Sequence, residues 1–445
     1  MTLEESIRHF ARTAPDRVAA VCSQERISYQ DLWKSIEDKA SQLRSSGLQH
    51  GRPYVFRATQ DIGFLIEYCA VHHAGAIAVP LGHSETESNM RTIREEVESL
   101  SFEGNISDIL YTTGTTGKSK GVMLSETALV TCSENFICDM QYTDDLCYII
   151  SGPLNHIASL FKIHPILSIG GTVCILDGLK DMNSFYEVLS LPFSKFATFL
   201  VPASIRMLLQ FSSDRLHSYA GVIDFIETGA APISRADMKQ LSETLPHSRL
   251  YNTYGGTEIG AVCTYNFNDG RYLEGCVGHP MKHSAIEITP EGGIIVSGPT
   301  VMSGYVGDED STRQILRDGR IYTSDLGYVD SEGMLHITGR QGNVINVGGF
   351  KVNPEDVERA ALSHPSVAEC VCVPAEHPVL GTVLKLVVVL REGCTLDRHS
   401  IAAHIGTLLE SHKIPVYYES VASLQRTYNG KLDRQYYQKK TLTLH

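Results

Sequence analysis

The sequence lacks the segments that direct or anchor a chain to a membrane. Its N-terminus, MTLEESIRHF, has acidic residues where a signal peptide needs a basic stretch followed by an apolar one. An extended apolar region at 63–81 is interrupted by Glu67, two histidines and glycines, which a bilayer-spanning helix would exclude. We therefore expect a cytoplasmic protein without a membrane span.

The sequence also lacks paired cysteines and an excess of positive charge. None of its eleven cysteines forms a C-x-x-C pair, and the closest two, Cys370 and Cys372, alternate along an apolar run typical of buried thiols in a reducing compartment. The 38 Lys and Arg residues stand against 51 Asp and Glu residues, for a net charge of −13. This balance opposes a broad nucleic-acid surface but permits a local basic pocket for one nucleotide.

Alternating helix and strand patterns place most of the chain in the α/β class. Ser28 and Asp31 resemble a helix cap, and apolar residues then recur at helical spacing as far as Gly47. Strand-like runs at 196–201 and 221–229 precede a helical segment at 234–245. These patterns predict parallel sheets covered by helices, with a small antiparallel β unit from residue 280 onward.

A second, smaller domain follows. The chain of 445 residues exceeds what one hydrophobic core usually serves. After Arg340, Asn353 and Pro354 predict the start of a helix in a compact α+β region. We predict a large N-terminal α/β domain at 1–341 and a smaller α+β domain at 342–445.

The segment YTTGTTGKSKG, residues 111–121, is a candidate phosphate loop. It is no Walker A loop, because Thr112 stands where the first glycine is required. It is no dinucleotide fingerprint either, because two threonines separate Gly114 from Gly117. Its hydroxyls, glycines and lysines suit a polyphosphate, and a Thr/Gly-rich surface turn is the alternative.

This segment resembles the phosphate loop of the adenylate-forming enzymes, which include acyl- and aryl-CoA ligases, peptide-synthetase adenylation domains and luciferases. The resemblance is nearest to the acyl-CoA synthetase branch. Further motifs of that family follow in order along nearly the whole chain: GAIAVPL (75–81), PLNHIASL (153–160), ETGAAPIS (227–234), NTYGGTE (252–258), YTSDLG (322–327), GRQGNVINVGGFKVNPEDVE (339–358) and NGKLDR (429–434).

The resemblance implies an ATP site. The phosphates would be bound by Thr112, Thr113, Gly114, Thr115, Thr116, Gly117 and Lys120. The adenine would be lined by Gly229, Ala230, Ala231 and Tyr254. Thr257 would bond the α-phosphate, Glu258 would hold Mg²⁺, and Asp325 and Arg340 would face the ribose. Without the motifs around them, the same residues would be interpreted as ordinary core, turn or surface positions.

The resemblance also implies the rest of the reaction. Lys431, otherwise an ordinary surface lysine, would neutralise charge during adenylation from a mobile C-terminal domain, and Gly348, Gly349 and Lys351 would line a tunnel for the pantetheine of coenzyme A. His156 would lie at the mouth of the acid pocket, with a core histidine as the alternative. The expected activity is acyl-CoA synthesis from a fatty or aromatic acid through an acyl-adenylate. An acyl carrier protein as acceptor and a non-catalytic nucleotide-binding regulator are the alternatives.

Two departures from the family pattern stand out. Only 30 residues separate Pro80 from Tyr111, which predicts a shortened N-terminal subdomain with an uncovered sheet edge. Such an edge invites pairing with a partner, including a second copy of the chain. At the expected hinge the chain has Gly342, which can adopt the backbone angles of either domain arrangement.

Overall fold

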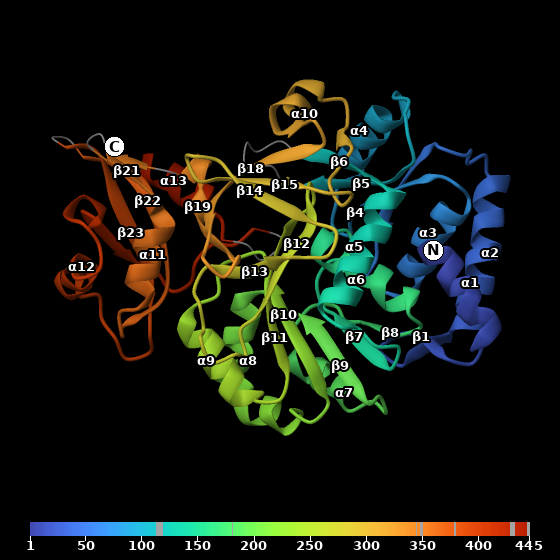
Figure 1. Cartoon of the computed structure of the whole chain (residues 1–445), viewed down its shortest axis with the longest axis horizontal. Coiled ribbons are helices and arrows are strands. Elements are labelled where there is room, and N and C mark those ends of the chain that lie inside the picture. Colours follow the sequence, from blue (N-terminus) through green and yellow to red (C-terminus); the bar gives the residue numbers. More distant parts are fainter. Residues whose placement is uncertain are drawn as a thin grey trace. The chain divides into compact units, whose positions relative to one another are not determined.

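The computed structural model describes residues 1–112, 119–179, 181–343, 345–347, 350–377, 380–427 and 432–442. They form two compact units (Figure 1). Unit 1 comprises Met1–Glu287, Ile295–Thr323 and Asp330–Leu335; unit 2 comprises Ile288–Ile294, Ser324–Val329 and His336–His445. The boundary between residues 341 and 342 stays a prediction.

Unit 1 is built on a large mixed sheet. Its strands run in the order β13-β12-β11-β10-β9-β7-β8-β1-β2. The pairs from β11 to β1 are parallel, and β2, β12 and β13 are antiparallel to their neighbours. The bounds are β1 (Val18–Cys22), β2 (Glu25–Ser28), β7 (Leu146–Ile150), β8 (Thr172–Ile175), β9 (Lys195–Phe199), β10 (Ile223–Gly229), β11 (Arg249–Gly256), β12 (Gly260–Asn266) and β13 (Cys276–Pro280).

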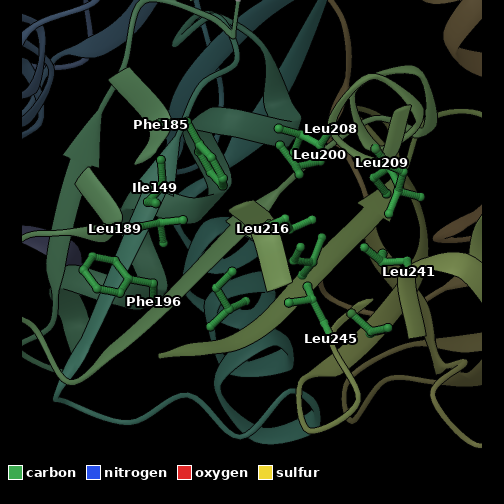
Figure 2. Packing of buried hydrophobic residues seen from close by; sticks show 14 of the residues in the cluster. Ile149, Phe185, Leu189, Phe196, Leu200, Leu208, Leu209, Leu216, Leu241 and Leu245 are labelled. Atoms are coloured by element: carbon green, nitrogen blue, oxygen red, sulfur yellow. The ribbon is translucent and has the colours of Figure 1, made fainter. Parts of the chain in front are cut away.

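Helices cover both faces of this sheet. On one face α7 (Met182–Leu189), α8 (Pro202–Ser218) and α9 (Arg235–Thr244) bury leucines and phenylalanines against strand residues such as Ile149 and Phe196 (Figure 2). On the other face lie α5 (Glu126–Asp139) and α6 (Ile157–Ser168).

A second sheet of unit 1 carries the candidate phosphate loop. Its order is β16-β6-β5-β4-β3, with β3 to β5 parallel and β6 antiparallel to β5. Ile109 of β5 packs with Ile93 and Val97 of α4 on one face. The bounds are β3 (Pro53–Ala58), β4 (Ile77–Gly82), β5 (Ile106–Thr112), β6 (Lys120–Ser125), β16 (Gly304–Tyr305), α1 (Leu3–Thr13), α2 (Tyr29–Ser45), α3 (Ile62–His73), α4 (Glu87–Glu98), α10 (Glu309–Ile315) and β17 (Leu316–Arg317).

Unit 2 is a small α+β structure. Its main sheet pairs β22 (Val367–His377) antiparallel with β23 (Gly381–Leu390), which pairs parallel with β24 (Tyr417–Ser420). The remaining elements are the hairpin β20 (Ile345–Val347) and β21 (Phe350–Val352), the helices α11 (Pro354–Leu362), α12 (Arg398–Gly406) and α13 (Arg434–Leu442), and the 3₁₀ turns Gln341–Asn343 and Ser411–Lys413. Four further strands each contain residues of both units: β14 (Ala285–Ile288), β15 (Gly293–Ser297), β18 (Arg320–Val329) and β19 (Leu335–Arg340).

The structure confirms the predicted fold class, with sheets that are mixed rather than purely parallel. The predicted caps are also confirmed, because Ser28 Oγ accepts the Asp31 amide at 3.1 Å and the Asn353 side chain accepts the Glu355 amide. Cys370 and Cys372 are buried free thiols, as expected. Among the helices that the structure describes, none combines the length and apolar character that crossing a bilayer requires.

Candidate functional site

The candidate site of unit 1 lies where parallel strands end. The register pairs Gly229 of β10 with Thr253 of β11, and Glu227 of β10 with Phe199 of β9. The carboxyl ends of β9, β10 and β11 therefore meet at one edge of the large sheet. Open α/β sheets bind their ligands outside this edge.

The end of β10 presents backbone rather than side chains. At Gly229 an added Cβ would lie 2.6 Å from the Thr253 carbonyl oxygen, so the close approach of the two strands requires glycine. Ala230 follows with φ of 63°, in the left-handed region that a non-glycine residue rarely adopts. Ala230 and Ala231 are exposed. The predicted adenine-lining segment is thus a strained, accessible turn.

The end of β11 brings Tyr254, Thr257 and Glu258 to the same edge. At Gly255 an added Cβ would lie 2.4 Å from the Gly260 carbonyl oxygen, so the turn into β12 is tight. Thr257 is 8% exposed, and Glu258 is half-buried. The Glu258 carbonyl accepts the Met302 amide at 2.9 Å, which fixes the backbone at the candidate metal ligand.

Tyr305 joins the candidate metal ligand to the candidate phosphate-binding lysine. Its hydroxyl donates to Glu258 Oε1 at 3.0 Å, and Lys120 Nζ lies 4.7 Å from the centre of its ring. Lys120 also donates to Ser311 Oγ at 2.7 Å and lies 3.7 Å from Asp308. Burial and the Glu258 carboxylate raise the pKa of Tyr305 well above its ordinary value, so the hydroxyl keeps its proton. Two predicted site residues that are far apart in sequence therefore share one neighbour.

No sequence motif points to Tyr305, Asp308 or Ser311 as site residues. The sequence VMSGYVGDED shows an aromatic residue and acids in a turn-rich region, but it does not indicate which residues they contact. Those contacts follow from the pairing of Tyr305 in β16 with Val122 in β6, which brings this segment beside Lys120.

The phosphate loop enters and leaves through paired strands. Thr112, the last residue of β5, pairs with Lys120, the first residue of β6, and Ser119 Oγ donates to the Thr112 carbonyl at 2.8 Å. Both predicted ends of the loop are therefore brought together. Some predicted residues lie outside the described residues: Thr113, Gly114, Thr115, Thr116, Gly117, Gly348, Gly349 and Lys431.

His156 lies at the start of α6. Its backbone carbonyl accepts the amides of Ser159 and Leu160 at 3.0 and 2.9 Å, and the residue is half-buried. It follows β7, which neighbours β9 in the sheet that carries the site. Its role at an acid pocket stays a prediction.

Unit 2 contains the predicted ribose pair. Arg340 Nε donates to Asp325 Oδ1 at 2.6 Å, and the side chains are 52% and 10% exposed. The structure thus brings these two residues together, on β18 and β19. An added Cβ at Gly342 would contact nothing within 4 Å, and Lys351 pairs with Asn346 in the β20–β21 hairpin.

No sequence motif indicates the buried ion pair of Lys162 and Glu227. Lys162 of α6 donates to Glu227 Oε1 at 2.8 Å and lies 2.6 Å from Oε2, and the two side chains are 2% and 1% exposed. The Tyr148 hydroxyl donates to the same carboxylate at 3.2 Å, and the Lys162 ammonium lies 3.4 Å from the ring centre of Phe136. Glu227 is two residues before Gly229, so the pair connects α6 to the end of β10.

In the part of the chain that the structure describes, no three His, Cys, Asp or Glu side chains gather in a way that could hold a metal ion. Glu258 is therefore a single carboxylate rather than part of a protein cage. A carboxylate has about four lone-pair sites, of which Tyr305 uses one. Mg²⁺ is commonly bound by one or two carboxylates together with substrate phosphates, and Glu258 fits that mode.

Comparison with known proteins shows the family. The AMP-binding enzyme family matches residues 7–101 and 103–306, and the AMP-binding enzyme C-terminal domain matches residues 356–431. The chain therefore belongs to the AMP-binding enzymes.

Similar curated proteins are CoA ligases and synthases. A feruloyl-CoA synthase from Amycolatopsis sp. is 26% identical, over 95% of this chain and 95% of its own length. A 2-succinylbenzoate–CoA ligase from Bacillus cereus is 24% identical, over 97% of each chain. A long-chain-fatty-acid–CoA ligase from Bacillus subtilis is 29% identical, over 75% of this chain but only 61% of its own length.

Solved structures show the same fold. ATP-bound MatB from Rhodopseudomonas palustris matches with a TM-score of 0.88 and 25% identity, over 99% of each chain. The o-succinylbenzoate CoA synthetase MenE from Bacillus subtilis, in complex with its acyl-adenylate intermediate, matches with a TM-score of 0.82 and 22% identity, over 97% of each chain.

Proposed function

We propose that this AMP-binding enzyme is an ATP-dependent acid–thiol ligase. In the first step a carboxylate oxygen of the acid attacks the α-phosphorus of ATP, and pyrophosphate leaves. In the second step a thiolate attacks the acyl carbon of the resulting mixed anhydride, and AMP leaves with the oxygen that joined it to the acid. The first step converts a carboxylate, which expels oxide poorly, into an acyl group with a good leaving group.

The observation that carries this proposal is the Glu258–Tyr305–Lys120 arrangement at the ligand-binding edge of the large sheet. Lys120 supplies a positive charge for the polyphosphate, and Glu258 supplies a hard oxygen ligand for its metal ion. Thr257 lies next to Glu258 with a hydroxyl that suits the α-phosphate, and the Gly229–Ala231 turn with Tyr254 supplies a surface for adenine. The similarity to ATP-bound MatB supports ATP as the nucleotide.

Mg²⁺ would arrive with ATP and be held by Glu258 and the phosphates. It would supply charge neutralisation for the phosphates during attack on the α-phosphorus. The chain's own part is to fix the Glu258 carboxylate, which Tyr305 does through its hydroxyl and Met302 through its backbone amide.

The acid and the thiol are assigned by class. NHIAS, around His156, contains no acidic side chain that could hold an α-ammonium group, so we infer an acid without an α-amine. The relatives reported above are named for CoA, which supports CoA as the thiol over the phosphopantetheine of a carrier protein. Gly348, Gly349 and Lys351 remain the proposed lining of the thiol tunnel.

A screen for pyrophosphate release tests the proposed function. Purified protein is incubated with Mg-ATP and short, medium, long-chain or aromatic acids, each with and without CoA. The proposal expects pyrophosphate release with one class of acid, and AMP with acyl-CoA when CoA is added. Binding of ATP without pyrophosphate release for any acid would favour a non-catalytic nucleotide-binding protein.

Tyr305→Phe tests the link between Glu258 and its neighbour. The change removes only the hydroxyl, so the ring remains beneath Lys120 while the Glu258 carboxylate loses a donor worth about 1.5–3 kcal/mol. We expect the Mg²⁺ concentration that half-saturates pyrophosphate release to rise on the order of 10- to 100-fold. Tyr322→Phe is the matched control, because the Tyr322 ring packs under Arg317 at 4.9 Å. Equal Mg²⁺ dependence of the two variants would remove Tyr305 from the metal site.

Asp325→Ala tests the proposed ribose site. The change removes a charged acceptor that Arg340 holds in place, and hydrogen bonds to a charged group contribute about 1.5–3 kcal/mol. Apparent ATP affinity should fall on the order of 10- to 100-fold, as titration calorimetry with ATP would show. Asp325→Asn, which keeps the shape and one acceptor, should lose less. An Asp325→Ala protein with wild-type ATP affinity and rate would contradict the assignment.

A further inference from the structure

A buried polar network in unit 1 contains none of the residues assigned above. Glu4 Oε1 lies 3.1 Å from His72 Nδ1, and Asp108 Oδ1 lies 2.7 Å from His72 Nε2. The Tyr68 oxygen lies 2.7 Å from Asp108 Oδ2 and 2.7 Å from His164 Nε2. We call these five residues the His72 network. They join α1, α3, β5 and α6.

The protons of the network can be assigned from its geometry. Both ring nitrogens of His72 face carboxylates, so both donate and the ring is an imidazolium. Asp108 can only accept, so the single Tyr68 hydrogen points to it, and His164 must donate its Nε2 hydrogen to the Tyr68 oxygen.

The pKa shifts agree with this assignment. Burial opposes the charge on His72, but the Asp108 and Glu4 carboxylates outweigh it and raise the pKa to about 10. Burial lowers the pKa of His164 to about 4, so that ring stays neutral near neutral pH.

Ser107, His72 and Asp108 do not form the catalytic triad of a hydrolase. Ser107 Oγ lies 3.3 Å from His72 Nε2, but that nitrogen already carries the hydrogen that Asp108 accepts. An imidazolium cannot take a proton from a serine, so His72 cannot serve as the general base for Ser107. A role in holding elements in place fits better.

Two of the linked elements lead into the proposed site. Side chains alternate along a strand, so Asp108, Leu110 and Thr112 of β5 share one face, and Thr112 is where the phosphate loop begins. Ile109 and Tyr111 take the opposite face, where the Tyr111 hydroxyl donates to Glu96 of α4 at 2.8 Å. His164 lies about two helical turns after His156, the residue that precedes α6.

A cavity lies beside the His72 network. Glu4, His72 and His164 border a cavity of about 310 Å³. The other titratable groups that line it are Glu5 and Arg8 of α1, His73 of α3, Glu126 of α5 and His50. The cavity leaves fewer packing contacts on this side. The hydrogen bonds of the network therefore contribute more to fixing β5 relative to α6.

We propose that the His72 network is a positioning device for adenylation, which sets the place of Thr112 through Asp108 and the place of His156 through His164. This inference rests on the proposed function for its catalytic consequence. Tyr68 is the central link, because its hydroxyl bonds both Asp108 of β5 and His164 of α6.

Tyr68→Phe removes that link and leaves the ring. Tyr29→Phe is the matched control, because Tyr29 is equally buried and its hydroxyl donates to the Gly171 carbonyl at 2.7 Å. Both variants should melt at similarly reduced temperatures. Only Tyr68→Phe should slow pyrophosphate release, by on the order of 10-fold or more, since a misplacement of about 1 Å can cost up to ~10²-fold. Equal kinetics of the two variants would overturn the proposal.

Calorimetric ATP affinity separates this inference from the proposed function. If the wild type binds ATP but releases no pyrophosphate with any acid, the ligase proposal fails. The positioning proposal still expects weaker ATP binding by Tyr68→Phe than by Tyr29→Phe, because Thr112 lies on the affected strand. Equal ATP affinities would then refute it independently.

His72→Gln adds a pH readout that simple loss of packing would not give. The folded pKa of His72 lies above the unfolded value, so its stabilisation is complete below about pH 6.5 and is lost as the pH rises through about 10. In the variant, Glu4 and Asp108 face each other without a cation, and one takes up a proton as the pH falls. The gap in melting temperature between wild type and variant should narrow from pH 6.5 to pH 5. A constant gap would contradict the charged network.

Discussion

Lys431→Ala should slow acyl-adenylate formation by on the order of 10²- to 10³-fold, by analogy with removal of one preorganised oxyanion donor. The Lys431 ammonium would neutralise negative charge that accumulates as the carboxylate approaches the α-phosphate. Once the mixed anhydride has formed, that approach is complete. Thioester formation from chemically supplied acyl-adenylate should therefore be largely spared.

Lys431 itself lies outside the described residues. Residues before and after it in the sequence are held by contacts of their own. Arg426 and Leu432 form an antiparallel bridge, and the Arg434 guanidinium donates to both Glu358 oxygens at 2.5 and 2.9 Å. Truncation of one side chain between these anchors should leave unit 2 folded.

The assay compares two rates on one variant: pyrophosphate release from acid and ATP, and CoA consumption from premade adenylate. Lys413→Ala is the control, because it removes a lysine of unit 2 whose 2.9 Å partner is the neighbouring Glu410. If both rates fall equally in Lys431→Ala, the residue either acts in both steps or is needed for the folded structure. If neither falls, the role inferred from the NGK motif is wrong.

Lys162→Met should destabilise unit 1 by about 3–5 kcal/mol, because it leaves the Glu227 carboxylate buried without its cation. Methionine fills much of the same volume, so the loss reports charge rather than a cavity. Burial lowers the pKa of Lys162, and the Glu227 carboxylate opposes that shift by stabilising the ammonium. Chemical denaturation monitored by circular dichroism measures the change.

A double variant separates the ion pair from packing. In Lys162→Met with Glu227→Leu both charges are absent, and replacement of a buried pair by apolar groups is often neutral or stabilising. We expect the double variant to regain most of the lost stability. It should still lose adenylation activity, because Glu227 is two residues before the Gly229 turn. A double variant as unstable as Lys162→Met would show that the ion pair is not the source of the loss.

Local features were predictable from the sequence because their causes lie within a few residues. Ser28 caps α2 through the Asp31 amide, and Asn353 caps α11 through the Glu355 amide. The alternating Cys370 and Cys372 are buried on β22, as their spacing predicted. Motif resemblance likewise identified the family, since its signals are contiguous segments.

Long-range pairs were not predictable in the same way. Tyr305 bonds Glu258 across 47 residues, and Tyr68 bonds His164 across 96. Lys162 in the sequence FKIH is a lone charge in an apolar helix, and its partner Glu227 is known only once α6 packs on the sheet that contains β10. Such pairs depend on which strand neighbours which, and residue patterns within a segment carry no such information.

An acyl-adenylate that links the acid to AMP is the defining intermediate of the proposed reaction, and oxygen transfer can reveal it. The acid found by the screen is labelled with ¹⁸O in its carboxylate, and the protein is incubated with it, Mg-ATP and CoA. Attack of the carboxylate on the α-phosphorus places one labelled oxygen on that phosphorus, and thiolate attack then releases it with AMP. The proposed reaction yields AMP that carries one ¹⁸O for each acyl thioester formed. Unlabelled AMP, or label found in inorganic phosphate with ADP as the other product, would contradict it.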